Sequence, residues 1–272
     1  MFILIVLLIV TIRIIEASNL LKHFEFDRLL TATDWIANTK FYTGILWNAR
    51  KKHTSVIFDN NLNDIWSSFD GMNWVEMTGA AGWSGRRDHT SVVYDSKIFV
   101  LGGSDGSSLN DIWASPDGVS WSQVTGAAGW SGRAGHASVV YNNMVFLLGG
   151  NNGTSYLNDV WSSVDGISWV EVTGAAGWSA RRDHTSVVFD SKIFVLGGSD
   201  VSGSFLNDIW SSSDGVSWSQ VTGGAGWSGR FGHTSVVYNN KIFVLGGHGA
   251  SGNLNDVWSS FDGVSWSQVT GG

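Results

Sequence analysis

The chain has 272 residues, of which 43% are hydrophobic and 14% charged, and its formal net charge at pH 7 is −7. This composition, with 35 Gly, 1 Pro and 16 Trp, excludes a disordered acidic chain and a Pro-rich linker and provides enough apolar surface for a core. The absence of a Lys/Arg block argues against nucleic acid as a binding partner. The absence of Cys excludes disulfides, thiol nucleophiles and Cys-ligated metals.

The chain opens with an uncharged apolar run, residues 1–12, which Arg13 interrupts. Twelve residues are too few for a transmembrane helix, so no stable membrane span is expected. The run fits the apolar part of a secretory signal, with Ala17 or Ser18 at the cleavage site, although no basic segment precedes it. Residues 1–18 are therefore predicted to be a signal-like leader and the protein to be secreted or extracytoplasmic. A membrane anchor, a retained strand and a cytoplasmic location are the alternatives.

Residues 19–49 are predicted to be an N-terminal extension. Its end, around Tyr42 and Trp47, resembles the worn remnant of a repeat that precedes the others.

From residue 50 onward the chain consists of five copies of one unit. Each copy carries one His and one Trp at fixed repeat positions. The spacing to the next such His is 23 residues from each of Trp66, Trp113, Trp161 and Trp210. The copies are residues 50–85, 86–132, 133–180, 181–229 and 230–272, and the first is incomplete: only 13 residues separate His53 from Trp66. After the first copy, the length varies only between a Gly-Gly pair and a Leu-Asn-Asp triplet.

Within each copy the local pattern predicts four strands. In the second copy, residues 89–94 and 98–101 are apolar runs joined by Asp95-Ser96, which suits a tight hairpin. The Asp-Gly pair of each copy, such as Asp117-Gly118, is typical of a type I′ turn between the third and fourth strands. Such a meander leaves apolar faces exposed unless the copies stack around an axis, so the sequence predicts an all-β propeller, with a β-solenoid as the second choice.

The pattern Arg-x-x-His, an apolar hairpin ending in Gly-Gly and a later Trp resembles the Kelch repeat. It is seen at Arg133, His136, Gly149-Gly150 and Trp169, and again at Arg230, His233, Gly246-Gly247 and Trp266. The resemblance implies a Kelch-type β-propeller of about five blades: four complete four-stranded blades and one incomplete first blade. It further implies that the first strand of each blade lines the central channel. Either the ring closes with one thin blade, or the chain forms an open arc.

The resemblance also implies a site. Arginines at this motif position in protein-binding Kelch domains can face the channel mouth and hold acidic peptide groups, as a forked guanidinium does well. The candidate ligand contacts are the motif arginines and the Trp residues of the Gly-rich loops: Arg86, Arg133, Arg181, Arg230, Trp83, Trp130, Trp178 and Trp227. The alternative for the arginines is a local ion pair, as Asp88 and Asp183 suggest, and the alternative for the loop Trp residues is a structural role.

No catalytic residue, metal site or cofactor is expected. The repeated His could form a metal-binding ring, but a residue present in every blade more simply satisfies a hydrogen bond that every blade needs. A copper centre like that of galactose oxidase needs a Cys, which is absent. The segment from Ser68 to Trp74 resembles the Asp-box of sialidases, a turn element. His248 is the one His outside the series in the copies after the first.

These observations favour a non-enzymatic Kelch-repeat module that binds a protein or peptide through the channel-mouth Arg and Trp residues and the variable loops. The alternative is a secreted, multivalent, carbohydrate-binding propeller in which the loop Trp residues face sugar rings and weak sites add in avidity. A glycan-active enzyme is the third choice.

Overall fold

The computed structural model describes residues 63–271, and its regular elements there are all β-strands. This part of the chain has no helix of the length and apolarity needed to cross a membrane. The predicted leader (1–18), the extension (19–49) and the start of the first copy, with Arg50 and His53, lie outside the described residues.

The strands form one small sheet and four larger antiparallel ones, each built from a single copy of the repeat. The incomplete first blade is β1 (Ile65–Ser68) and β2 (Trp74–Thr78). The second blade is β3 (Thr90–Tyr94), β4 (Lys97–Ser104), β5 (Ser108–Ser115) and β6 (Ser122–Thr125), and the third is β7 (Ala137–Tyr141), β8 (Met144–Asn151), β9 (Tyr156–Ser163) and β10 (Val170–Thr173).

In the fourth and fifth blades the innermost strand is split into two segments that pair with the same neighbour. The fourth blade is β11 (Arg181–Arg182), β12 (Thr185–Phe189), β13 (Lys192–Asp200), β14 (Phe205–Ser212) and β15 (Ser219–Thr222). The fifth is β16 (Arg230–Phe231), β17 (Thr234–Tyr238), β18 (Lys241–Gly249), β19 (Gly252–Ser260) and β20 (Ser267–Thr270).

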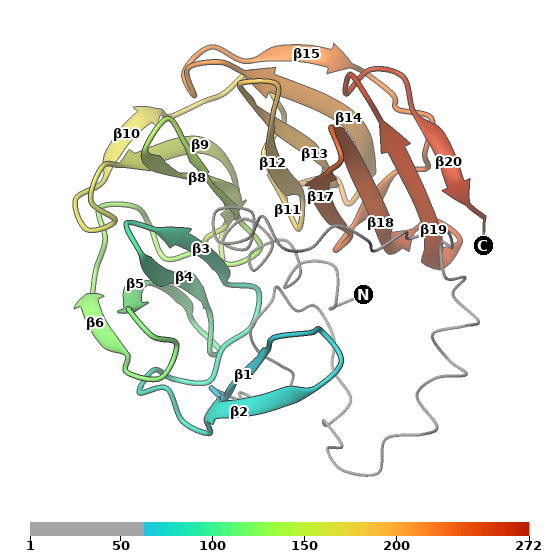
Figure 1. Cartoon of the computed structure of the whole chain (residues 1–272). Coiled ribbons are helices and arrows are strands. Elements are labelled where there is room, and N and C mark those ends of the chain that lie inside the picture. Colours follow the sequence, from blue (N-terminus) through green and yellow to red (C-terminus); the bar gives the residue numbers. More distant parts are fainter. Residues whose placement is uncertain (1–62, 272) are drawn as a thin grey trace.

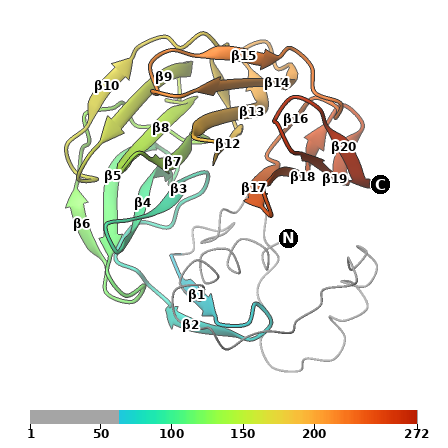
Figure 2. The same ribbon diagram turned by 45° about the horizontal axis from the view of Figure 1, so that its top comes forward.

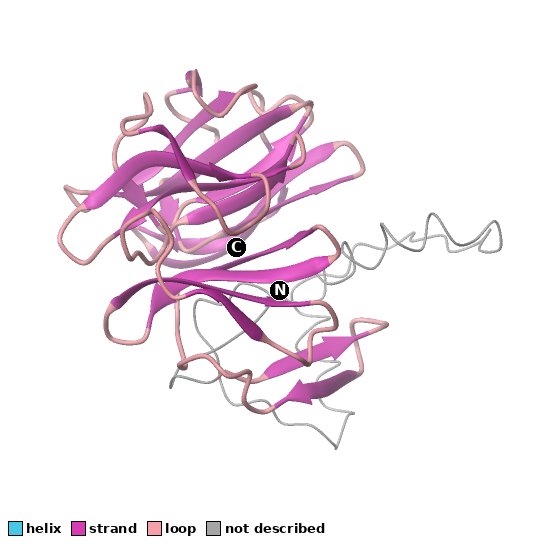
Figure 3. Cartoon of the chain, turned by 90° about the vertical axis from the view of Figure 1, so that its left-hand side faces the viewer, coloured by secondary structure: helices cyan, strands magenta, loops and turns pink. Residues whose placement is uncertain are grey.

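The sheets are arranged as blades around a common axis, with β3, β7, β12 and β17 innermost and β6, β10, β15 and β20 outermost (Figures 1 and 2). The side view shows strands in every blade, joined by loops at the two rims (Figure 3). The prediction of an all-β propeller with four complete blades and one incomplete blade is confirmed, and the solenoid is excluded.

The two hairpin predictions have different outcomes. The tight turn between the first two strands is confirmed, because both of its residues have positive φ, as at Asp95 (45°) and Ser96 (57°). The type I′ prediction for Asp-Gly is wrong, because only the Gly has positive φ and six residues separate β5 from β6. Asp117 Oδ1 instead accepts the N–H groups of Val119 and Ser120, and Ser115 Oγ accepts that of Gly118, so these residues form a turn element, as the Asp-box resemblance implies.

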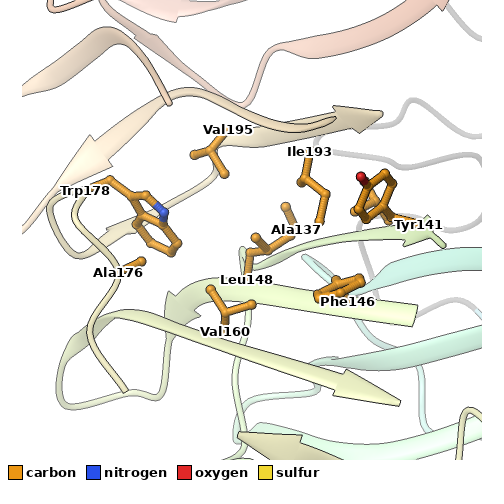
Figure 4. Close-up of a cluster of buried hydrophobic side chains, with 10 residues drawn as sticks. Ala137, Tyr141, Phe146, Leu148, Val160, Ala176, Trp178, Ile193 and Val195 are labelled. Carbon is orange, nitrogen blue, oxygen red and sulfur yellow. The ribbon is translucent and has the colours of Figure 1, made fainter. Parts of the chain in front are cut away.

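The core lies between blades rather than within them. At the interface of the third and fourth blades, Phe146 and Leu148 of β8 face Ile193 and Val195 of β13, and Trp178 closes the outer side (Figure 4). All five side chains are at most 1% exposed. Each blade hides its apolar face on the next, which is the reason that the strands are rich in β-branched and aromatic residues.

Near the axis, a backbone hydrogen-bond chain joins the four complete blades. Gly135 N donates to Asp88 O (2.8 Å), Asp183 N to Gly135 O (2.7 Å) and Gly232 N to Asp183 O (2.9 Å). All four residues have φ between 53° and 63°. This collar consists of one residue from each blade, and Gly or Asp stands there because those residues tolerate the left-handed region.

Candidate functional site

The motif arginines lie inside the blades. Arg181 Nη1 and Nη2 both donate to the carboxylate of Asp208 (2.8 Å each), Nη1 also donates to Gly197 O, and Nε donates to Ser179 O. Arg181 is 0% exposed, and the equivalent bidentate pairs join Arg86 to Asp111, Arg133 to Asp159 and Arg230 to Asp256. Hydrogen bonds from Arg230 lower the pKa of Asp256, so this pair is ionised near neutral pH.

This arrangement corrects two expectations. The arginines do not reach into a channel mouth, because their guanidinium groups already donate to Asp, Ser and Gly oxygens within the blade. The local pair that the sequence left open does form, but with a different partner: Arg181 pairs with Asp208 on β14, whereas Asp183 lies 3.8 Å from the neighbouring Arg182.

The loop Trp residues are also buried. Trp83 is 3% exposed, and Trp130, Trp178 and Trp227 are 1% exposed. Trp178 stacks edge-to-face on Trp218 of the next sheet (5.9 Å) and lies 5.8 Å from the Arg181 guanidinium, a cation–π contact. Their structural role is thus visible, and none of the four indole rings presents a flat face to solvent. The carbohydrate-binding alternative stays a prediction, and it needs a surface other than these rings.

The repeated His residues are buried between the innermost strands. His136 Nε2 lies 2.9 Å from Thr90 Oγ1 of the preceding blade, and His233 makes the same contact with Thr185 (3.0 Å). Burial and the nearby Arg133 lower the pKa of His136 to about 3, and burial with Arg230 does the same for His233. His136, His184 and His233 are therefore neutral. His136 and His233 make the hydrogen bond that was predicted for the series, whereas His184 Nε2 has no such partner among the described residues. In the part of the chain that the structure describes, no group of His, Asp or Glu is arranged to hold a metal ion.

The loops that differ in length between copies lie at one rim. We define the loop rim as the edge that carries the four loops after the Gly-Gly strands, residues 105–107, 152–155, 201–204 and 250–251. The Gly-rich Trp loops lie against the same edge, since Asn110 Nδ2 donates to Ala128 O and Trp130 O.

Two repeat positions meet across each pair of blades on the loop rim. One precedes the Leu-Asn-Asp triplet, and the other follows the motif Arg. Between the third and fourth blades they are Tyr156 and Arg182, whose guanidinium carbon lies 5.2 Å from the Tyr ring centre. Between the fourth and fifth blades they are Phe205 and Phe231, whose ring centres are 5.2 Å apart.

His248 completes an aromatic cluster with these two Phe residues. Its ring lies 5.9 Å from Phe205 and 5.3 Å from Phe231, and its Nδ1 is 2.9 Å from Asn253 Oδ1. All three rings are half-buried, so part of each remains accessible. Between the second and third blades the same two positions hold Ser108 and Ala134. The loop rim therefore changes from small side chains on one side to aromatic and cationic ones on the other.

The sequence prediction did not find Tyr156, Arg182, Phe205 or Phe231, and it noted His248 only as an outlier. The available signal was the departure from the repeat, because recognition by one ligand needs side chains that differ between blades. The residues present in every complete copy, which are the motif Arg, the loop Trp and the His, are instead buried and stabilise the blades.

Comparison with known families supports the fold assignment. The family model of the KLHDC2/KLHL20/DRC7 Kelch-repeats domain matches residues 164–271, and the Kelch motif model matches residues 85–114 and 132–162. No curated protein matches the chain. The matched segments together include strands of all four complete blades.

Proposed function

Because the chain belongs to the Kelch-repeat propeller family, we propose that it is a non-enzymatic interaction module that binds a protein or peptide at its loop rim. Kelch-repeat propellers are typical protein-interaction modules, and variable loops on a rigid scaffold commonly carry binding. The observation that supports this location is the asymmetry of the rim, where Tyr156–Arg182 and the Phe205–Phe231–His248 cluster replace the small side chains of the second and third blades.

The chemistry of these side chains indicates the ligand class. Arg182 is 38% exposed, and its contact with Asp183 is long at 3.8 Å, so its forked guanidinium can donate hydrogen bonds to a carboxylate of a ligand. The half-buried aromatic cluster offers an apolar surface in the neighbouring blade pair. We expect a peptide with an acidic residue near a large apolar one. In this proposal Arg86, Arg133, Arg181 and Arg230, with the four loop Trp residues, support the rim from within.

Selection from a random peptide library tests this function. The immobilised full chain should enrich peptides with an acidic and an apolar position, and Arg182→Ala and Phe231→Ala should each weaken binding of the enriched peptide about tenfold. Arg87→Ala is the matched control, since Arg87 occupies the repeat position of Arg182 in the second blade and is 59% exposed. Failure to enrich any peptide, or equal losses with Arg87→Ala and Arg182→Ala, would contradict the proposal.

A further inference from the structure

The loop between β8 and β9 contains a sequence that no other copy has. Asn152-Gly153-Thr154 is the only Asn-x-Ser/Thr triplet in the 272 residues. At the corresponding place, counted from the Gly-Gly pair, the other complete blades read Asp-Gly-Ser, Asp-Val-Ser and Gly-Ala-Ser. This triplet is the acceptor signal for N-linked glycans, provided that it lies on an accessible loop of a protein that enters the secretory pathway.

The loop holds the triplet in an accessible position. Gly153, Thr154 and Ser155 are exposed. Asn152 Oδ1 accepts hydrogen bonds from Thr154 N (3.0 Å), Thr154 Oγ1 (2.9 Å) and Ser155 N (2.8 Å). Within the described residues Asn152 Nδ2 makes no hydrogen bond, and it is not among the buried polar atoms. The amide oxygen is therefore held by the Thr and the backbone, whereas the amide nitrogen is neither hydrogen-bonded within the described residues nor fully buried.

From this geometry we infer that Asn152 is an N-glycosylation site. The donor is an oligosaccharide linked to a lipid through pyrophosphate. Asn152 Nδ2 attacks the first sugar carbon, a C–N bond forms, the bond from that carbon to the pyrophosphate oxygen breaks, and the amide proton leaves with the lipid pyrophosphate. The step needs neither an oxidant nor a reductant.

The site also depends on the route of the chain through the cell. Residues 1–18, which we propose to be a signal-like leader, would direct the chain into the compartment where the transfer takes place. The glycan would stand on the loop rim in the third blade, four residues before Tyr156. It would leave the Phe205–Phe231–His248 cluster, in the next pair of blades, open to a partner.

The test is translation of the full chain in the presence of endoplasmic reticulum microsomes. We expect a protease-protected product that is heavier by one glycan and that returns to the unmodified mass after treatment with peptide-N-glycosidase. That enzyme converts the modified Asn to Asp, so peptide mass spectrometry should find Asp at position 152.

Four variants test whether the mass shift depends on the Asn-x-Ser/Thr triplet itself. Asn152→Gln and Thr154→Ala should abolish the mass shift, whereas Thr154→Ser should keep it. Asn151→Gln, next to the site, is the matched control and should be glycosylated like the unaltered chain. An unmodified chain inside the microsomes, or a chain that stays outside them, would overturn the inference. Neither outcome affects the proposed peptide binding, which the library selection measures separately.

Discussion

The interfaces between complete blades differ from the interface that joins the first blade to the second. Ile193 and Ile242 are 0% exposed on the faces that receive the preceding complete blade, but the equivalent Ile98 is only half-buried, and nearby Val93 is 47% exposed. Phe99, Phe146 and Phe194 each reach across to a turn glycine of the next blade, Gly166, Gly215 and Gly263. Among the described residues, the equivalent Gly118 faces only Ile98 of its own blade.

The described part of the first blade contains two strands, whereas each complete blade contains four or five. In complete blades the two inner strands contribute most of the apolar face, while β1 and β2 are the counterparts of the two outer strands. Their contribution to the second blade is a small cluster of Ile65, Ala81 and Trp83 around Val100. Among the described residues, the first blade thus contributes the outer half of this interface, and inner apolar residues of the second blade such as Ile98 stay partly exposed.

Acid should weaken the complete interfaces strongly, because they bury His136, His184 and His233 as neutral imidazoles. Their pKa values are lowered in the fold, to about 3 for His136 and His233, whereas in the unfolded chain they return to about 6.5. Between these values the unfolded state binds more protons, so stability falls as the pH falls from about 6.5 toward 3. Each His should remove about 1.4 kcal/mol per pH unit there.

Urea unfolding at several pH values between 6.5 and 4 measures this slope. His136→Asn should make the dependence shallower by the contribution of one group, even if it lowers stability at pH 7. An unchanged slope would show that His136 is protonated in the folded state.

Removing a motif arginine should have the largest effect of any single substitution. Arg181→Leu leaves the carboxylate of Asp208, which is 15% exposed, without its bidentate partner, at a cost of about 3–5 kcal/mol. Arg86→Leu should cost about as much, because the pair with Asp111 lies within one blade and does not depend on the neighbour. Urea unfolding of both variants checks this, and a much smaller loss for Arg86→Leu would mean that the interface contributes to the pair.

The same substitution at equivalent positions of the two kinds of interface should give different losses. Ile193→Ala removes a fully buried side chain and should lower the free energy of unfolding by about 3 kcal/mol. Ile98→Ala should cost about half as much, since Ile98 is already partly exposed. Equal losses in urea unfolding would show that the incomplete blade covers Ile98 as well as a complete one would.

A smaller contrast is expected for the Tyr residues that end the innermost strands. The hydroxyl of Tyr94 donates to Asn143 O (2.9 Å) and Val164 O (2.6 Å) of the next blade, so Tyr94→Phe should cost about 1 kcal/mol. Tyr238, in the last blade, is 48% exposed, and Tyr238→Phe should leave the thermal midpoint unchanged. A comparable shift for both variants would contradict a bridging role for Tyr94.

The smallest expected effect is an increase in the free energy of unfolding. His136 and His233 each contact a Thr, but the position that faces His184 is Ala137, and His184 Nε2 is buried with no hydrogen-bond partner. Ala137→Thr should add that partner and raise stability by about 1 kcal/mol. Thr90→Ala is the matched reverse change and should lower it by a similar amount. A loss of stability with Ala137→Thr would mean that the site has no room for the hydroxyl.

Prediction from sequence succeeded where the repeat itself carries the information. The blades, their number and the turn at Asp95-Ser96 follow from periodicity and turn chemistry. The Asp-Gly turn was assigned to the wrong type, because hydrogen bonds from Val119 and Ser120 to the Asp117 side chain outweigh the preference of the dipeptide.

The site was harder to predict, because contacts across the sheet are distant in sequence. Asp183 is two residues from Arg181 and looked like its partner, but Asp208, which is 27 residues away, lies opposite it on β14. The Arg and the Asp of this pair recur in every complete copy. Their separation in the sequence does not indicate that they are in contact, so the pairing was not predicted. The Phe205–Phe231 contact needs two blades to meet, which a single copy cannot show.

The collar around the axis has a consequence for changes in copy number. Gly135 and Asp183 each supply one donor and one acceptor to this chain of backbone hydrogen bonds, Asp88 supplies an acceptor and Gly232 a donor. Duplication or loss of a whole copy would therefore reproduce this backbone hydrogen bond, whichever side chains the copy carries. Segments that begin and end at these residues are the units by which such a gene can lengthen or shorten while its product still assembles.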